Sequence, residues 1–276
     1  MVKTWFITGT STGLGRLLTE RLLARGDRVA ATLRTPGALD GLVAQYGDRL
    51  QVLTLDVTDT KALRTAVAEA FAHMGRIDVV VSNAGYGLFG AAEELSDTQI
   101  ERQIATNLVG SIQVVRAVLP HLRAQGGGRI VQVSSEGGQI AYPNFSVYHA
   151  TKWGIEGFVE SVAKEVAPFG IDFLLIEPGP TGTGFGAGLD HAAPMPSYED
   201  TPSGDVRRAI ASGAFVIKGD AARTVDAMIV AADAEAAPLR LALGSTAYAS
   251  ISQALAERLR QLEVQKALTL SADGGE

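Results

Sequence analysis

The chain has 276 residues, of which 46% are hydrophobic and 20% charged. This composition can bury a core, so it excludes intrinsic disorder and collagen-like or low-complexity structure. The formal net charge is -6 without an offsetting basic stretch, which argues against nucleic acid or an anionic membrane as a partner. The chain has no cysteine, which excludes disulfides, thiolate metal sites and cysteine nucleophiles.

The amino-terminal residues, MVKTWFITGT, enter a strand-like run at once and lack the apolar region and cleavage site of a signal peptide. No stretch approaches the run of about 18 apolar residues that would span a bilayer. We therefore expect a cytoplasmic protein without a transmembrane helix, whose partners are small molecules.

Short apolar runs rich in β-branched residues alternate with segments of helical periodicity along the whole chain. The apolar runs predict strands at 3–8, 28–33, 50–55, 77–82, 129–134, 171–176 and 239–243. The helical segments lie at 13–25, 37–46, 60–74, 97–124, 148–167, 219–233 and 246–268. This alternation predicts an α/β fold: a doubly wound, Rossmann-type, mostly parallel seven-stranded sheet with helices on both faces. We expect a single domain over 1–276, with a carboxyl-terminal strand and helix at 238–268.

Residues 180–204 break this rhythm, because glycine and proline interrupt every few residues. The segment follows the sixth strand, and ligands of such sheets bind outside the carboxyl ends of strands. We therefore expect 184–215 to form a mobile substrate lid, in which Pro194, Pro196 and Pro202 prevent a continuous helix. Phe185, Leu189 and Met195 would supply apolar surface to the closed form. The alternative is a permanently packed loop.

A glycine-rich segment, TGTSTGLG at 8–15, lies between the first strand and the first helix. Gly9, Gly13 and Gly15 would let the backbone approach a pyrophosphate, and the helix amino terminus would supply free N–H donors. An ordinary glycine turn is the alternative interpretation.

Tyr148 and Lys152, in YHATK, stand four residues apart at the start of a helical segment and therefore share one face. The neighbouring ammonium should favour the phenolate, so this tyrosine could act as an acid or base nearer neutral pH than its free pKa of about 10 allows. The alternative is a lysine that extends to solvent beside a half-buried tyrosine. Ser135, at the end of the fifth strand, favours a site because its hydroxyl could share a substrate oxygen with the phenol.

In order and spacing these motifs resemble the short-chain dehydrogenases/reductases, and more closely their hydroxysteroid-dehydrogenase-like branch. The resemblance also covers Asp56 in LDVTD as the adenine contact, the NAG motif at 83–85, Asn107 in TNLVG, and PGPTGT at 178–183. It implies four catalytic residues: Asn107, Ser135, Tyr148 and Lys152. It implies that the cofactor is bound by Gly9, Ser11, Thr12, Gly13, Leu14, Gly15, Arg34, Asp56, Val57, Asn83, Ala84, Gly85, Tyr148, Lys152, Pro178, Gly179, Thr181 and Thr183.

The resemblance implies an oxidoreductase that reduces a ketone or aldehyde to an alcohol, or runs the reverse reaction. NAD(P)H would deliver hydride to the carbonyl carbon while Tyr148 donates the proton and Ser135 orients the oxygen. Lys152 would hold the ribose, and Asn107 would hold a water that relays protons. The alternatives are an NADP-linked oxidation of a secondary alcohol such as a steroid or retinoid, and a non-catalytic NADP-sensing protein. Family members commonly form homo-oligomers through helices like 97–124 and 148–167, so we expect a homodimer or homotetramer.

Cofactor choice should be decided at the end of the second strand, in ATLRT. A carboxylate there would bind the ribose 2′-OH of NAD, but no acid occupies 32–35. Arg34, helped by Thr12, could instead bind the 2′-phosphate of NADP, so NADP(H) is favoured over NAD(H). The alternative is a solvated surface arginine.

Glu136 follows Ser135 where the resembling branch places substrate-lining residues, and Tyr142 is expected in the same cleft. The Glu136 carboxylate either selects a polar or basic substrate or faces solvent. The histidines show no paired metal-ligand spacing, so we expect no metal and surface or helix-face positions for them. Two helical apolar stripes are interpreted as core or subunit contact: Trp153, Phe158, Val162 and Val166, and Ile251, Leu255, Leu259 and Leu262.

Overall fold

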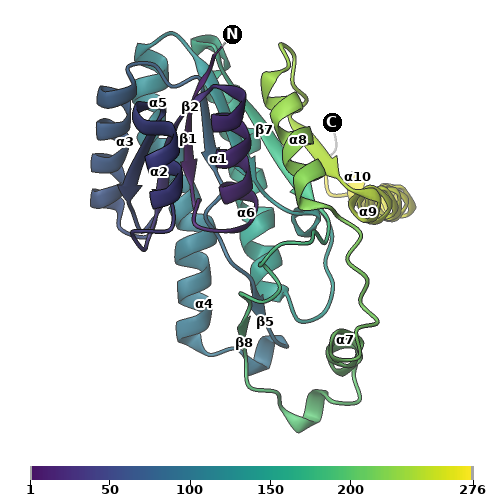
Figure 1. Ribbon diagram of the computed structural model, residues 1–276. Coiled ribbons are helices and arrows are strands. Elements are labelled where there is room, and N and C mark those ends of the chain that lie inside the picture. The colour runs from purple at the N-terminus through teal and green to yellow at the C-terminus, as the bar shows by residue number, and fades with distance from the viewer. Residues whose placement is uncertain (1, 275–276) are drawn as a thin grey trace.

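The computed structural model describes residues 2–274 and is built around one parallel sheet (Figure 1). The seven strands lie in the order β3-β2-β1-β4-β6-β7-β9, and every neighbouring pair is parallel. The strands are β1 (Thr4–Thr8), β2 (Arg28–Leu33), β3 (Leu50–Thr54), β4 (Val79–Ser82), β6 (Gly128–Val133), β7 (Ile171–Pro178) and β9 (Arg240–Leu243). The predicted fold class is confirmed.

Helices cover both faces of this sheet. One face carries α1 (Gly13–Arg25), α2 (Asp40–Tyr46) and α8 (Ala221–Asp233), and the other carries α3 (Thr60–Met74), α5 (Ser111–Ala124) and α6 (Ser146–Val166). Successive strand residues point to opposite faces, so Trp5 and Ile7 join one core while Phe6 joins the other. Burial on both sides explains why these strands are continuous apolar runs.

The chain reverses its direction of travel across the sheet between β1 and β4. From β1 it winds outward to β2 and β3, and from β4 it winds the other way to β6, β7 and β9. The loops after β1 and β4 therefore diverge at the carboxyl edge, which is where such sheets bind ligands. In Figure 1 this edge faces down, toward α4 (Asp97–Gln103), β5 (Leu88–Phe89), β8 (Asp190–His191) and α7 (Pro202–Ala211).

The helix predicted at 97–124 is not a continuous α-helix. A π-helical segment, η3 (Ile104–Gly110), separates α4 from α5. Such wide turns accommodate an extra residue and occur often at functional sites. The prediction missed it because apolar periodicity does not register an inserted residue within an otherwise helical run.

The expected lid, 184–215, contains more structure than predicted. Its β8 pairs with β5 in a separate two-stranded parallel sheet, and α7 occupies its second half. Pro202 begins α7 rather than preventing a helix, because the first turn of a helix does not use the N–H that proline lacks. No continuous helix runs through 184–215, as the prolines predicted, but the short helix that Pro202 begins was not foreseen.

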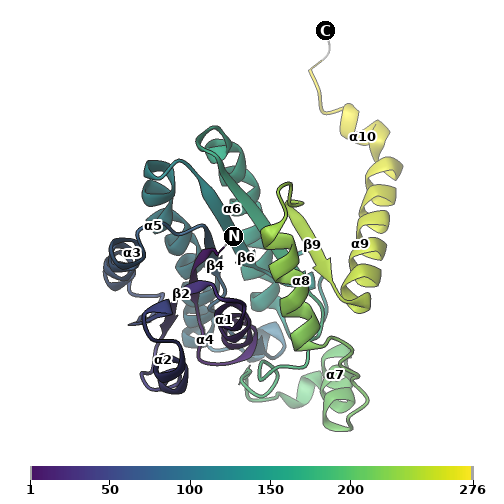
Figure 2. The same cartoon turned by 45° about the horizontal axis from the view of Figure 1, so that its top comes forward.

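Beyond β9, α9 (Ser245–Val264) passes along the sheet edge and continues with α10 (Lys266–Leu270) away from the body of the molecule (Figure 2). Ile251 is buried, but Leu255, Leu259 and Leu262 are 48%, 60% and 53% exposed. Of the apolar stripe predicted on this helix, only the first residue, Ile251, belongs to the core. Short helical turns complete the described chain: η1 (Gly47–Arg49), η2 (Ala92–Glu94), η4 (Glu136–Gly138), η5 (Ala167–Phe169) and η6 (Pro196–Tyr198). Within residues 2–274 no helix combines the length and the apolar character needed to cross a membrane.

Candidate active site

The loop between β1 and α1 forms a close-fitting backbone cradle. Gly9 and Gly13 have φ values of +73° and +61°, which favour glycine. A Cβ on Gly15 would lie 2.4 Å from the Gly9 carbonyl oxygen, so this turn of α1 needs a bare backbone. Thr12 caps α1 without a side-chain hydrogen bond, which leaves the first N–H groups of the helix for an anion. The cradle fits the diphosphate of a dinucleotide.

Asn83, after β4, fastens this cradle to the centre of the sheet. Its Nδ2 donates to the carbonyl oxygens of Thr8 at 2.9 Å and Gly9 at 3.0 Å, and its backbone N–H donates to Thr8 Oγ1 at 2.9 Å. A Cβ on Gly9 would lie 2.8 Å from the Cα of Ala84, so the two loops pack backbone to backbone. These contacts hold the NAG segment against the end of β1 and the cradle.

Asn107 lies in η3 with 1% of its surface exposed. Its Nδ2 donates to the Tyr86 carbonyl oxygen at 2.7 Å, and the Tyr86 N–H donates to Oδ1 at 3.1 Å. The side chain therefore braces the segment that follows the NAG motif. Both polar atoms of the Asn107 side chain are therefore hydrogen-bonded to Tyr86, so a proton relay at this position would have to use other groups.

Ser135, Tyr148 and Lys152 come together at the carboxyl edge, from the end of β6 and the first turns of α6. All three are buried, at 8%, 7% and 7% exposure. Lys152 Nζ donates to the Val133 carbonyl oxygen at 3.0 Å and lies 5.6 Å from the centre of the Tyr148 ring. Ser135 Oγ accepts from the Gly137 N–H at 3.1 Å. The predicted juxtaposition of a phenol, a hydroxyl and an ammonium is present.

Burial controls the ionisation of this group. It raises the pKa of Tyr148 to about 12, against a hydrogen bond with Ser135 that lowers it. It also lowers the pKa of Lys152 to about 8, against the charge of Glu156. The expected shift of Tyr148 toward phenolate is therefore wrong here, because desolvation raises the pKa and the charges of Glu136 and Glu156 add to that effect. A neutral phenol at neutral pH is suited to donating a proton.

Arg34 and Asp56 mark the adenosine end of the predicted cofactor site, after β2 and β3, and both are exposed. Partial burial raises the pKa of Asp56, but hydrogen bonds from Thr58 and the charge of Arg34 lower it by more. The two side chains are thus close enough to interact. Val57, next to Asp56, is buried against Gly110 of η3.

The PGPTGT segment leaves the end of β7 at the carboxyl edge of the sheet. Gly179 N–H donates to the Leu243 carbonyl oxygen at 3.0 Å, which ties the turn to β9. Thr181 Oγ1 donates to the Gly179 carbonyl oxygen at 2.8 Å, and Thr183 Oγ1 accepts from the Phe185 N–H at 3.2 Å. The hydroxyl groups of Thr181 and Thr183 thus hold the backbone of this segment, which leads directly into the expected lid.

Glu136 is 3% exposed, so the alternative that it faces solvent is wrong. Its Oε2 accepts from Ser250 Oγ of α9 at 2.8 Å. Burial raises the pKa of Glu136, and the bond from Ser250 opposes the shift. The charge of Glu136 also acts on Tyr148 and Tyr142 and raises the pKa of both phenols, which places the three side chains near one another.

His149 lies on a face of α6, one of the two positions predicted for the histidines, but it is 4% exposed and so not at the surface. Its ring lies 4.4 Å from the ring of Tyr142, centre to centre, and burial lowers its pKa to about 4. The position is open to an imidazole because Gly137 has no side chain: a Cβ there would be 2.7 Å from His149 Cδ2. Neutral His149 is part of the wall behind Tyr148.

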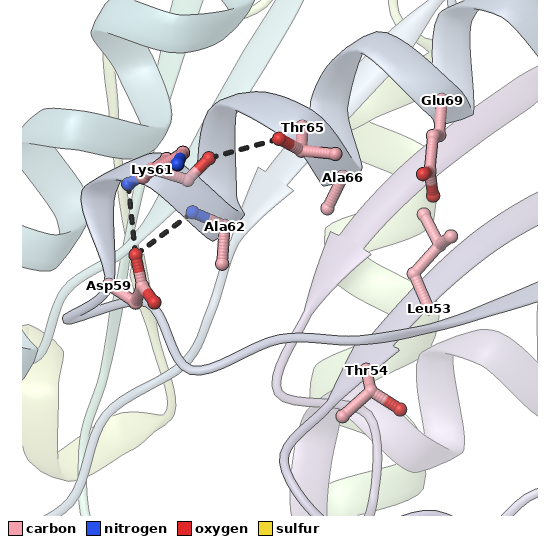
Figure 3. Close-up of a pocket in the computed structure, with 8 residues that line it drawn as sticks. All are labelled: Leu53, Thr54, Asp59, Lys61, Ala62, Thr65, Ala66 and Glu69. Carbon is pink, nitrogen blue, oxygen red and sulfur yellow. Dashed lines mark hydrogen bonds between the residues drawn. The ribbon is translucent and has the colours of Figure 1, made fainter.

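A shallow hollow elsewhere, between β3 and α3, is not part of this arrangement (Figure 3). Its polar groups stabilise the start of α3: Asp59 Oδ1 accepts from the N–H groups of Lys61 at 3.0 Å and Ala62 at 2.9 Å. These bonds are an ordinary helix cap, and the hollow contributes no chemistry to the site.

Comparison with known proteins identifies the class. Residues 3–193 match the family described as short chain dehydrogenase, and the chain belongs to this family. It is accordingly an NAD(P)-dependent oxidoreductase.

Oxidoreductase BOA17 of Botryotinia fuckeliana (strain B05.10) is 46% identical over 180 residues, which cover 65% of this chain and 66% of that protein. Human 17-beta-hydroxysteroid dehydrogenase type 1 is 39% identical over 189 residues, 65% of this chain and 57% of that enzyme. The chain thus spans less than two thirds of either relative. A crystal structure of a short-chain dehydrogenase from Streptomyces avermitilis has a TM-score of 0.92 at 38% identity and covers 99% of this chain and 100% of that one.

Proposed function

We propose that the protein is an NADPH-preferring carbonyl reductase, which reduces a ketone or aldehyde or runs the reverse reaction. The observation that supports this most strongly is the buried group of Tyr148, Ser135 and Lys152, which lies at the same carboxyl edge of the sheet as the glycine cradle. The nicotinamide cofactor, when bound, supplies the hydride. A panel of ketones and aldehydes assayed by NADPH oxidation tests the proposal: cofactor binding without turnover of any carbonyl would favour the sensing role instead.

In this proposal Tyr148 donates the proton to the carbonyl oxygen, and Ser135 polarises and orients that oxygen. The high pKa of Tyr148 keeps the phenol protonated at neutral pH, as reduction requires. One N–H of the Lys152 ammonium donates to the Val133 carbonyl oxygen. The other two would hold the ribose and return a proton to the phenol. Asn107 supports the relay by fixing the segment that follows the NAG motif.

The cofactor would be held by the residues that the resemblance implies. Ser11, Thr12, Gly13 and Leu14 belong to the open cradle and the first turn of α1, and Asp56 and Val57 follow β3. Pro178, Gly179, Thr181 and Thr183 would bind the nicotinamide amide. Preference for NADP over NAD rests on exposed Arg34 and on the lack of an acid at 32–35.

Similarity to a 17-beta-hydroxysteroid dehydrogenase favours a second candidate, the NADP-linked oxidation of a secondary alcohol. Aromatic rings beside Tyr148 are suited to an apolar substrate: Phe145 and Phe185 have ring centres 5.9 Å and 5.7 Å from that of Tyr148. Oxidation needs the phenolate, so its rate should rise with pH toward the pKa of Tyr148. A rate of alcohol oxidation that is independent of pH would contradict this candidate.

We propose that Glu136 and Tyr142 line the substrate cleft, because Glu136 is buried beside Tyr148 with one carboxylate oxygen held by Ser250. Glu136→Gln is expected to raise KM about tenfold for a ketone that carries an ammonium group, because a charge-assisted hydrogen bond is lost. KM for an uncharged ketone of similar size should not change. An equal effect on both ketones would remove Glu136 from the substrate contacts.

Polar side-chain bonds fasten the proposed lid to the rest of the chain from Asp190 onward, whereas its first residues are rich in glycine. Arg102 pairs with Asp190, Arg207 pairs with Glu94, and Tyr198 Oη donates to Glu93 at 2.9 Å. In contrast, Phe185 is 40% exposed within a glycine-rich stretch and packs on Tyr148. We infer that lid movement is concentrated around Phe185, which must move aside to admit substrate.

Limited chymotrypsin digestion tests the lid. We expect cleavage after Phe185 in the free protein, and protection when NADPH and a ketone found in the assay are present together. Tyr198 serves as an internal control, because its bond to Glu93 should keep it slow under both conditions. A permanently packed loop would give the same digestion rate at Phe185 with and without ligands.

A homodimer or homotetramer remains our proposal for the assembly. The exposed apolar residues of α9 and Trp153 of α6, which lies 4.8 Å beneath the Arg258 guanidinium, are suited to subunit contact. Light scattering during gel filtration would disprove an oligomer by returning the mass of one chain. The cytoplasmic location also stays a prediction, which fractionation of the source cells can test.

A further inference from the structure

A partly buried cluster of charged side chains lies beside the candidate active site, between α6 and the sheet. Arg240 of β9 donates to Glu156 Oε2 at 2.6 Å and to Glu177 Oε1 at 2.5 Å, and it also binds Glu160 at 2.8 Å. The side chains of Glu156 and Glu177 are only 3% and 2% exposed. Buried carboxylates cost free energy to desolvate, so a cluster in this place invites a functional explanation.

Neighbouring strands bring these residues together. Arg240 pairs in register with Leu175 of β7, so it points to the sheet face that α6 covers, and Glu177, two residues on, points the same way. From α6, Glu156 reaches down to the end of β6, where Ser134 Oγ donates to its Oε1. A Cβ on Gly138 would lie 1.8 Å from that oxygen, so η4 is packed directly against the carboxylate.

The cluster touches both elements that carry the catalytic group. Glu156 is one helical turn beyond Lys152, and Ser134 stands between Val133 and Ser135. Two hydrogen bonds therefore join the same part of α6 to the same strand end: Lys152 Nζ to the Val133 carbonyl, and Ser134 Oγ to Glu156. Loss of the second bond would loosen the register between Ser135 and Tyr148.

The cluster also sets the electrostatic surroundings of Lys152. The titratable and charged groups packed around this part of α6 are Tyr148 and Glu160 on α6 itself, Glu136 on η4, Glu177 on β7 and Arg240 on β9. Among the carboxylates around Arg240, the charge of Glu156 favours the protonated form of Lys152, against the burial that lowers the Lys152 pKa. Burial raises the pKa of Glu156 itself, and its hydrogen bonds from Arg240 and Ser134 oppose that shift and favour the ionised carboxylate.

Building on the proposed function, we propose that Glu156 is a positioning residue for the active site. It acts through the Ser134 hydroxyl to hold Ser135 against Tyr148, and through its negative charge to keep Lys152 protonated. Neither effect requires Glu156 to touch substrate or cofactor.

The charge effect can be measured without turnover. In protein labelled with ¹³C,¹⁵N-lysine, the NMR signal of the Lys152 side chain, assigned with Lys152→Arg, gives its pKa directly. Glu156→Gln is expected to lower this pKa by about one unit, a tenfold loss of proton affinity. Glu160→Gln is the matched control: it shares Arg240 but is half exposed and two turns away, so the Lys152 pKa should not move. An unchanged Lys152 pKa in Glu156→Gln would overturn the proposal.

The positioning effect is measured by turnover of a ketone from the assay. Glu156→Gln should move the alkaline fall of kcat about one pH unit lower, because Lys152 then loses its proton earlier. Ser134→Ala should lower kcat about tenfold, as expected when a charge-assisted hydrogen bond is lost, with no shift of the pH profile and no change in NADPH affinity. Ser161→Ala, an exposed serine on α6, controls for the substitution itself.

If Glu156→Gln does not fold, Ser134→Ala still tests the proposal. A kcat of Ser134→Ala equal to that of the wild type would overturn the proposal. The proposed function can fail separately: if the wild-type protein reduces no carbonyl, the lysine titration still tests the charge effect.

Discussion

Tyr148→Phe is expected to lower the kcat of NADPH-dependent ketone reduction by about 10²-fold or more, the range for loss of a general acid. The substitution removes the phenol oxygen but keeps the ring, which packs against Phe145 and Phe185. NADPH affinity should barely change, because the glycine cradle and Arg34 are untouched. Steady-state kinetics and a fluorescence titration measure the two quantities.

Tyr248→Phe is the matched control for this experiment, since Tyr248 is 72% exposed on α9 and should keep full activity. Turnover of Tyr148→Phe near that of the wild type would remove Tyr148 from the mechanism. A parallel loss of NADPH binding would indicate instead that the ring had moved.

The fold was largely predictable because parallel strands buried on both faces leave an unmistakable pattern. Each of the seven predicted strands overlaps an observed one, and the predicted interruption follows the sixth strand. Spacing also located the candidate catalytic pair: four residues on a helix fix Tyr148 and Lys152 on one face regardless of context. These features depend on local geometry, which a sequence specifies directly.

Features that depend on distant partners were not predictable in this way. Asn107, in the π-helical turn, is hydrogen-bonded to Tyr86 on a different segment. The short strand β8 pairs with β5, which lies about one hundred residues earlier in the chain. His149 is buried because Gly137, on another element, leaves space for it. No periodicity reveals such complementarity.

The ionisation of the site shows the same limit. The neighbouring ammonium suggested an acidic phenol, but the balance depends on how fully Tyr148 and Lys152 are removed from water. The acid cluster around Arg240 was likewise hidden, because Ser134, Glu156, Glu177 and Arg240 become neighbours only once β6, β7 and β9 are side by side.

Arg34→Leu is expected to reduce kcat/KM for NADPH by roughly 10- to 100-fold and to leave kcat/KM for NADH almost unchanged. Only NADPH carries the 2′-phosphate, and a charge-assisted hydrogen bond to it contributes about 1.5–3 kcal/mol. Arg34 is exposed at the end of β2, so its removal should not disturb the core. Arg64→Leu, at an exposed position on α3, controls for the loss of one positive charge. Parallel kinetics with both cofactors decide the matter: an equal loss with NADH and NADPH would show that Arg34 does not bind the 2′-phosphate.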